Sequence, residues 1–218
     1  MTEETASNET SAACKAASTN DVIDVAVIGA GPAGLTAGLY AARAGLNVVL
    51  FERISPGGQL AQTEHMENYP GFPEGTGGFE LAFAMKQQAD RFGASNVGEE
   101  VVSVDFTQNP KVLTTAFNEY RAKSVIIATG DYENDDEMMA YYEAEMANIY
   151  RKEQNKTGDG QKMMVWAGAC MEDACGSKVQ HDFDAGPGSM ADMPFLAVKN
   201  DGSRFCNEAA CEMAVMGN

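Results

Sequence analysis

The sequence predicts an α/β protein with a parallel central sheet, and three observations lead to that class. A nearly unbroken apolar run covers residues 22–28, as expected for a strand buried on both faces of a sheet. Helix-forming residues follow at 32–44, and a second apolar run covers residues 47–51. The order strand, helix, strand is that of a βαβ unit, in which the two strands are parallel.

The connection between the first strand and the helix has the pattern G-x-G-x-x-G, at residues 29–34. Gly29 permits a tight turn, Gly31 lets the main chain approach a diphosphate, and Gly34 lets the helix pack closely on the strand. The N–H groups at the start of the helix then face the phosphates, where the helix dipole favours negative charge. The pattern and its setting together predict a Rossmann-like dinucleotide site.

Glu52 supplies a further sign of such a site. It ends the second strand, near the spacing of about 20 residues at which an acid meets a ribose hydroxyl. A carboxylate at this place also disfavours a 2′-phosphate, because two negative groups repel each other.

The remaining elements follow in order along the chain. Residues 1–20 lack hydrophobic periodicity and predict a flexible tail. Residues 55–78 are rich in glycine and proline, which predicts a long irregular connection of the kind that is often functional. The patterns further predict a helix at 79–92, strands at 101–106, 112–117 and 124–128, helices at 138–150 and 160–171, and a short strand at 195–198.

Composition limits the partners. With 32 acidic against 15 basic residues the formal net charge is −17, which disfavours nucleic acid and anionic membrane surfaces. No apolar run is long enough to span a membrane and no secretory signal is visible, so we expect a cytoplasmic protein. Five cysteines without a C-x-x-C pair predict reduced thiols and no metal site.

Residues 24–130 resemble the FAD-binding part of the low-molecular-weight thioredoxin reductases. The resemblance is carried by VAVIGAGPAGLTAGLYAARAGLNVVLFE, PGGQLAQT, ENYPGFPEG, QADRFGA and IIATG, in that order. It implies FAD as the cofactor, with the diphosphate at the glycine loop, the adenosine ribose at Glu52, the adenine at the Val101 backbone and the isoalloxazine near Asn68. The cofactor-binding residues so implied are Gly29, Gly31, Pro32, Ala33, Gly34, Glu52, Arg53, Gly58, Gln59, Asn68, Val101, Thr129 and Gly130.

Beyond residue 130 the pattern changes. The second glycine loop and the C-x-x-C dithiol of a thioredoxin reductase do not follow. Residues 128–218 instead resemble the fumarate reductase and succinate dehydrogenase flavoprotein family, through TGDG-x-K-M, WAGA and R-F-x-N-E. That resemblance implies a cap over the flavin, with Glu208 in substrate binding or proton delivery and Arg204 supporting it. An ordinary exposed acid at position 208 is the alternative.

These observations predict three parts: a flexible tail at 1–20, a Rossmann-like FAD-binding domain at 21–130 and a partial α+β cap-like region at 131–218. The predicted function is an FAD-dependent oxidoreductase acting on a small-molecule substrate or a redox partner, with homo-oligomerisation left open. Two alternatives remain: a fumarate reductase-type flavoprotein that reduces an unsaturated acid, and a truncated FAD-binding module without turnover.

Overall fold

The computed structural model describes residues 21–144 and 156–171. The chain divides into two compact units, Met1–Asp131 with Gly158–Ala169, and Tyr132–Thr157 with Cys170–Asn218. Residues 158–169, which the sequence places in the cap-like region, thus belong to the same unit as the glycine loop. Among the described residues, no helix combines the length and the hydropathy needed to cross a membrane.

The predicted βαβ unit is confirmed. It consists of strand β1 (Ile23–Ile28), helix α1 (Pro32–Arg43) and strand β2 (Val48–Phe51), and the two strands pair in parallel. All four residues of β2 are buried, as are five of the six in β1. Both strands are therefore covered on both faces, as their unbroken apolar runs predict.

A second crossover returns the chain to the other edge of β2. It contains the 3₁₀ helix η1 (Gly58–Gln62), helix α2 (Gly78–Arg91) and the short parallel strand β3 (Ser95–Val97). The sequence predicted α2 but neither η1 nor β3. A strand of three residues is too short for its apolar pattern to stand out.

The next three described strands form an antiparallel meander, which joins the predicted parallel strands in one mixed sheet. They are β4 (Val101–Asp105), β5 (Lys111–Thr115) and β6 (Glu119–Ile127). The sheet order is β3-β2-β1-β6-β5-β4, with β6 parallel to β1 and antiparallel to β5. The connections at 106–110 and 116–118 are too short for a crossover, and short connections join antiparallel strands. β6 also begins at Glu119, earlier than predicted.

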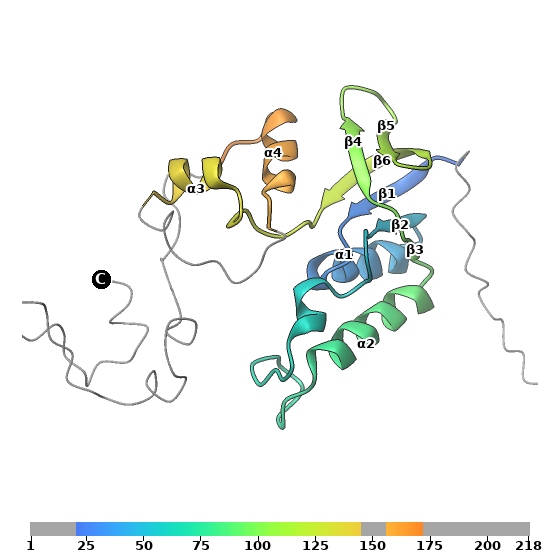
Figure 1. Ribbon diagram of the computed structural model, residues 1–218. Coiled ribbons are helices and arrows are strands. Elements are labelled where there is room, and N and C mark those ends of the chain that lie inside the picture. The colour runs from blue at the N-terminus through green and yellow to red at the C-terminus, as the bar shows by residue number, and fades with distance from the viewer. Residues whose placement is uncertain (1–20, 145–155, 172–218) are drawn as a thin grey trace, which may run out of the picture. The chain divides into compact units, whose positions relative to one another are not determined.

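Helices α1 and α2 cover one face of the parallel strands, and the meander covers the other (Figure 1). Val27 and Leu50 lie in the apolar cluster with α1 and α2. Phe51 lies in the cluster on the other face, where its ring meets the edge of Tyr120 at a centroid distance of 4.9 Å. Burial of these side chains on both faces is the main stabilising contribution to the first unit.

A polar network joins the segment before the meander to the β5–β6 hairpin. The Glu99 carboxylate accepts hydrogen bonds from Thr115 Oγ1 at 2.5 Å, Asn118 Nδ2 at 2.9 Å and the Tyr120 hydroxyl at 3.2 Å. Burial and the neighbouring Glu99 raise the pKa of Tyr120. The phenol therefore stays protonated and acts as a donor, which ties the start of β4 to the β5–β6 hairpin.

After β6, the described residues form helices α3 (Asp136–Tyr142) and α4 (Asp159–Trp166). Helix α4 belongs to the first unit. It ends at Trp166 and not at the predicted residue 171, because Gly168, with φ +100°, stops the helix. Helix α3 belongs to the second unit, where Asp135 caps it by accepting from the Met138 N–H. The predicted helix at 138–150 lies only partly within the described residues, and the predicted strand at 195–198 lies wholly outside them.

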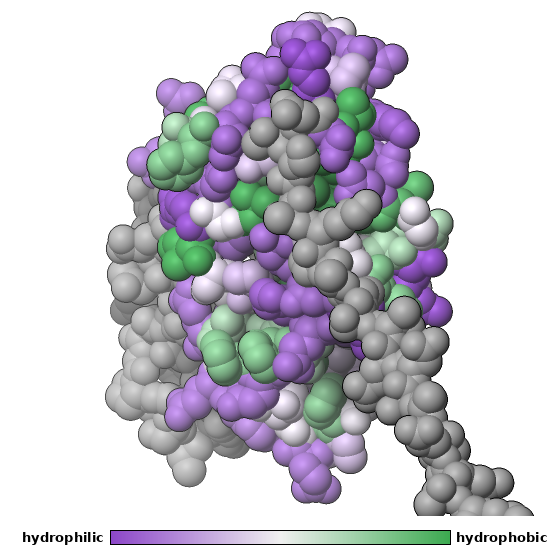
Figure 2. Space-filling view, turned by 90° about the vertical axis from the view of Figure 1, so that its right-hand side faces the viewer, coloured by the Kyte–Doolittle hydropathy of each residue, from purple (hydrophilic) through white to green (hydrophobic). Residues whose placement is uncertain are grey.

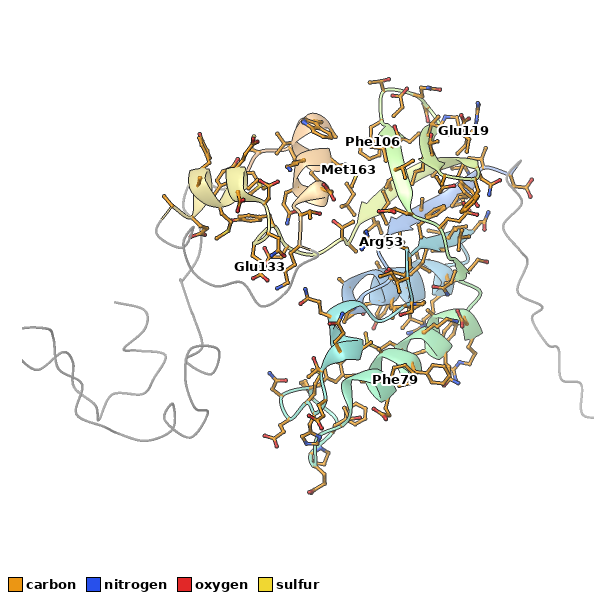
Figure 3. The ribbon with its side chains drawn as sticks, viewed as in Figure 1. Arg53, Phe79, Phe106, Glu119, Glu133 and Met163 are labelled. Atoms are coloured by element: carbon orange, nitrogen blue, oxygen red, sulfur yellow. The ribbon has the colours of Figure 1, made fainter. Side chains whose placement is uncertain are left out.

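Most of the face seen in Figure 2 is hydrophilic, and hydrophobic side chains appear there in separate spots. Several aromatic side chains of the first unit are exposed, among them Phe79 and Phe83 of α2, whose rings stack at a centroid distance of 6.2 Å. Phe79 projects from α2 (Figure 3). Scattered exposed apolar residues of this kind are usual on folded proteins.

Candidate functional site

The glycine loop contains two kinds of glycine. A Cβ atom at Gly34 would overlap the Gly29 carbonyl, and one at Gly29 would overlap the Ala128 carbonyl. At Gly31, by contrast, the nearest atom to an added Cβ would be the Gly58 Cα, 4.0 Å away. Gly29 and Gly34 are thus required by the protein's own packing, whereas the space beside Gly31 is open.

The first turn of α1 faces this open space, and none of the residues that the structure describes caps it with a side chain. Gly31 is the N-cap residue, it makes no side-chain cap hydrogen bond, and no acidic residue lies in the first turn, residues 32–35. The Leu35 N–H donates to the Gly31 carbonyl at 2.9 Å and is the start of the helical ladder. The N–H groups of Ala33 and Gly34 precede that ladder, so they and the positive end of the helix dipole are available to an anion.

Glu52 lies beside the loop, at the carboxyl end of β2. Its Oε2 accepts from the Ala30 N–H at 3.0 Å and its Oε1 from the Ile54 N–H at 3.3 Å. The two main-chain donors orient the carboxylate but use only two of its roughly four lone-pair sites. In the described part of the chain no cation pairs with Glu52. The carboxylate can therefore still accept from hydroxyl groups.

The start of the long connection also meets the glycine loop. The Gly57 N–H donates to the Ala30 carbonyl at 2.7 Å, and a Cβ atom at Gly58 would lie 3.1 Å from the Gly31 Cα. Gln59 follows on η1 and is exposed. The predicted residues Gly31 and Gly58 are therefore neighbours in space.

Asn68 lies further along the same connection. It is exposed, in the segment that the backbone bridge between Met66 and Thr76 closes. Within the described residues no hydrogen bond joins it to the glycine loop. Its contact with the isoalloxazine remains a prediction.

The end of β6 forms the second wall of the site. The Ala128 N–H donates to the Ile28 carbonyl at 2.8 Å, and a Cβ at Gly29 would lie 3.3 Å from the Thr129 Cα. Thr129 and Gly130 are exposed, and Gly130 has φ +90°. The predicted turn after β6 is thus brought against the predicted glycine loop.

The segment before Val101 approaches the end of β2. The Glu52 N–H donates to the Val97 carbonyl at 3.1 Å, and Arg53 Nη1 lies 3.4 Å from Glu100 Oε1. Val101 begins β4 and is half-buried. Arg53 and Val101 are thereby placed on the Glu52 side of the site.

Two predicted residues, Arg204 and Glu208, lie outside the described residues. The sequence did not single out Ala30, whose N–H orients Glu52 and whose carbonyl accepts from Gly57. Main-chain hydrogen bonds depend on backbone position and not on the side chain, so an alanine inside the pattern gives no signal. Among the described residues, no group of His, Cys, Asp or Glu side chains has the arrangement of a metal site.

Comparison with known proteins gives the family. The model of the pyridine nucleotide-disulphide oxidoreductase family matches residues 23–158, more than half of the chain. The chain belongs to the pyridine nucleotide-disulphide oxidoreductase family. It is 50% identical over 111 residues to the thioredoxin reductase of Peptoclostridium litorale, covering 50% of this chain and 35% of that one. It is 38% identical over 150 residues to that of Aquifex aeolicus, covering 68% and 42%.

A solved structure is also similar. The thioredoxin reductase of Lactococcus lactis in its FR conformation has a TM-score of 0.48 and 41% identity, covering 50% of this chain and 35% of that one. The chain spans about a third of the length of the first of the curated relatives, 35%. The family model ends at residue 158, and the resemblance of residues 128–218 to fumarate reductase flavoproteins stays a prediction.

The proteins of this pyridine nucleotide-disulphide oxidoreductase family are FAD-binding flavoproteins, so FAD is the cofactor of the chain. The residues present fit that group. An uncapped helix start and an open position at Gly31 suit a diphosphate, and the oriented Glu52 carboxylate suits ribose hydroxyls. Two glycines from different segments, Gly31 and Gly58, leave the backbone accessible between them.

Proposed function

We propose that this chain supplies the FAD-binding part of an oxidoreductase and that the described unit binds the whole adenosine diphosphate portion of the cofactor. One observation carries the proposal. The uncapped start of α1 opens at Gly31, where no atom of the described residues comes closer than 4.0 Å to an added Cβ, next to a carboxylate held by the Ala30 N–H. The site thus places N–H groups that can donate to an anion next to a carboxylate that can accept from hydroxyl groups.

The chain's own groups divide the binding between them. The amides of the helix start bind the diphosphate, and Glu52 accepts from the ribose hydroxyls. Arg53 and the Val101 backbone lie on the adenine side, whereas Gly58, Gln59 and Asn68 follow the flavin side. Thr129 and Gly130 are the second close approach to the cofactor. When bound, FAD supplies the transfer of a hydride or of single electrons, and the protein fixes its orientation.

The partner that exchanges electrons with the flavin is also part of this proposal. Several relatives are named thioredoxin reductases, which supports a redox partner of the thioredoxin kind. The only cysteine among the described residues is Cys170, which is exposed. We propose that the partner is met in the cytoplasm, the location that the sequence predicts.

A second candidate rests on residues 128–218, whose motifs resemble fumarate reductase flavoproteins. It is favoured by α4, the helix of the TGDG-x-K-M motif, which belongs to the same compact unit as the glycine loop. In this candidate Arg204 and Glu208 serve an unsaturated acid. Rapid reoxidation of reduced, FAD-loaded protein by fumarate would support it, and reoxidation no faster than that of free reduced FAD would contradict it.

The variant Gly31→Ala tests the main proposal. Gly31 has φ −70° and ψ −176°, which any residue can adopt, and its Cβ would meet nothing closer than 4.0 Å. We therefore expect unchanged thermal unfolding without FAD. The added methyl group occupies the space proposed for the diphosphate, so we expect the FAD dissociation constant to rise by about tenfold or more, equivalent to about 1.4 kcal/mol.

Fluorescence titration of the full chain with FAD measures this affinity. Ala84→Val, which adds carbon atoms at an exposed position of α2, is the control and should bind FAD like the parent. The proposal is wrong if the parent takes up no FAD saturably, or if Gly31→Ala binds FAD as tightly as the parent.

A further inference from the structure

Helix α4 is seated on the end of β6 because position 160 has no side chain. A Cβ atom at Gly160 would overlap the Thr129 hydroxyl and lie 2.8 Å from Ile127 Cγ2. Met163 packs against the apolar cluster that contains Phe51 and Tyr120. Figure 3 labels Met163 on the side of α4 that faces β6. The absence of a side chain at position 160 thus lets the first turn of α4 contact the turn after β6 directly.

Hydrogen bonds then fix that turn from the same helix. Gln161 Nε2 donates to the Gly130 carbonyl at 2.9 Å, and the Gly158 N–H donates to the Asp131 carbonyl at 3.2 Å. Gln161 Oε1 is buried without a hydrogen-bond partner in the part of the chain that the structure describes. The polar contribution of this side chain therefore lies in its bond to Gly130.

Any displacement of Thr129 and Gly130 reaches the glycine loop. The Ala128 carbonyl lies where a Gly29 side chain would be, and the Thr129 Cα would be 3.3 Å from it. The Ala128 N–H is bound to the Ile28 carbonyl at 2.8 Å. There is no spare room between the two segments, so close-packed neighbours must move together.

We infer that α4 contributes to FAD binding, and that its residues Gly160 and Gln161 are positioning residues. They fix the Thr129–Gly130 turn against the glycine loop and thereby set the affinity for FAD and the orientation in which it is bound. Neither residue lies in residues 24–130, where the FAD-domain resemblance falls. The inference rests on the proposed function, since it concerns the same cofactor.

The variant Gln161→Met tests this directly, since methionine keeps the length of the side chain but cannot donate to Gly130. We expect faster amide hydrogen exchange in residues 128–131 without FAD. We also expect an FAD dissociation constant about fivefold higher, the effect of losing roughly one neutral hydrogen bond, and an altered visible circular dichroism band of bound flavin. Gln87→Met, the same change at an exposed position of α2, should alter none of the three.

The three readouts separate the outcomes. Faster exchange with unchanged FAD affinity and circular dichroism would mean that the contact serves only the fold, and would overturn the inference. Unchanged exchange would overturn it as well. A parent chain that binds no FAD would refute the proposed function, and the positioning role toward FAD would fall with it, even if exchange still responds to the variant.

A second variant, Gly160→Ala, tests the packing contact. Its Cβ requires α4 to move away from Ile127 and Thr129. We expect weaker FAD binding than in Gln161→Met, with a lower midpoint of thermal unfolding. A Gly160→Ala protein that binds FAD like the parent would contradict the inference.

Discussion

Two carboxylates, Asp24 and Glu52, lie at opposite ends of the same parallel strands and have different surroundings. Asp24 stands near the amino end of β1, and Glu52 follows the carboxyl end of β2. Asp24 Oδ1 accepts from Lys123 Nζ at 2.6 Å, and its Oδ2 accepts from the Asn47 N–H at 2.9 Å. One end of the sheet is thus closed by an ion pair within the chain.

Glu52 has main-chain donors only. Its oxygens accept from the Ala30 and Ile54 N–H groups, and in the described part of the chain no lysine or arginine neutralises it. The carboxylate is oriented, but its charge is not compensated by the chain. The comparison teaches that a neutralised acid marks a structural contact, whereas an oriented and uncompensated acid beside an open helix start marks a ligand site.

The glycines of the loop also divide into those required by packing, among them Gly34, and one beside open space, Gly31. Replacing Gly34 gives the largest predicted effect, a loss of stability. In Gly34→Ala the new Cβ overlaps the Gly29 carbonyl and lies 3.3 Å from Val27 Cγ1, so α1 must move off β1. We expect a loss of about 3 kcal/mol in the free energy of unfolding, measured by urea denaturation without FAD. Gly31→Ala is the matched control and should unfold like the parent. Equal stability losses in the two variants would abolish the distinction.

The next effect concerns Glu52. In Glu52→Gln the carbonyl oxygen can keep the bond to the Ala30 N–H, but the longer bond from the Ile54 N–H and the charged acceptor for ribose hydroxyls are lost. We expect an FAD dissociation constant about tenfold higher, because hydrogen bonds to charged groups contribute about 1.5–3 kcal/mol. Stability without FAD should change little. A variant that binds FAD like the parent would show that Glu52 does not contact the sugar.

The smallest effect is expected from Asp24→Asn, and it depends on pH. Hydrogen bonds from Lys123 and the Asn47 N–H lower the pKa of Asp24 below its ordinary value of 3.8. A lowered pKa in the folded state means that the carboxylate stabilises the fold above about pH 3.8, and that this contribution is lost as the pH falls through the folded pKa. The Lys123 side chain is exposed and Asp24 is only partly buried, so the contribution of the pair is small.

Thermal unfolding of the parent and of Asp24→Asn over a pH series measures this effect. The parent should be the more stable protein near neutral pH, and the difference should vanish well below pH 3.8. FAD affinity should be the same in both proteins. Weaker FAD binding by Asp24→Asn would show that the two ends of the sheet are not independent.

Much of the site could be predicted from sequence because its signals are local. The apolar runs, the glycine pattern and Glu52 lie within one βαβ unit, where chain neighbours are also neighbours in space. The resemblance named Gly58 and Gly31 only as cofactor-binding residues, and the structure shows that their backbones are neighbours. The bond from Gln161 to Gly130 had no signal, since 31 positions separate the two residues and a glutamine on a helix is unremarkable in composition.

The sequence by itself determined the βαβ unit, the glycine loop and the acid beside it, because hydrophobic period and glycine freedom act over a few residues. Only the tertiary structure decided three other features: β6 lies between β1 and β5, the meander is antiparallel, and α4 is seated on β6. Helices α1 and α2 pack on one side of the sheet, and the other elements cover the apolar face that remains. Which elements cover that face depends on the whole fold, so a local sequence pattern does not predict it.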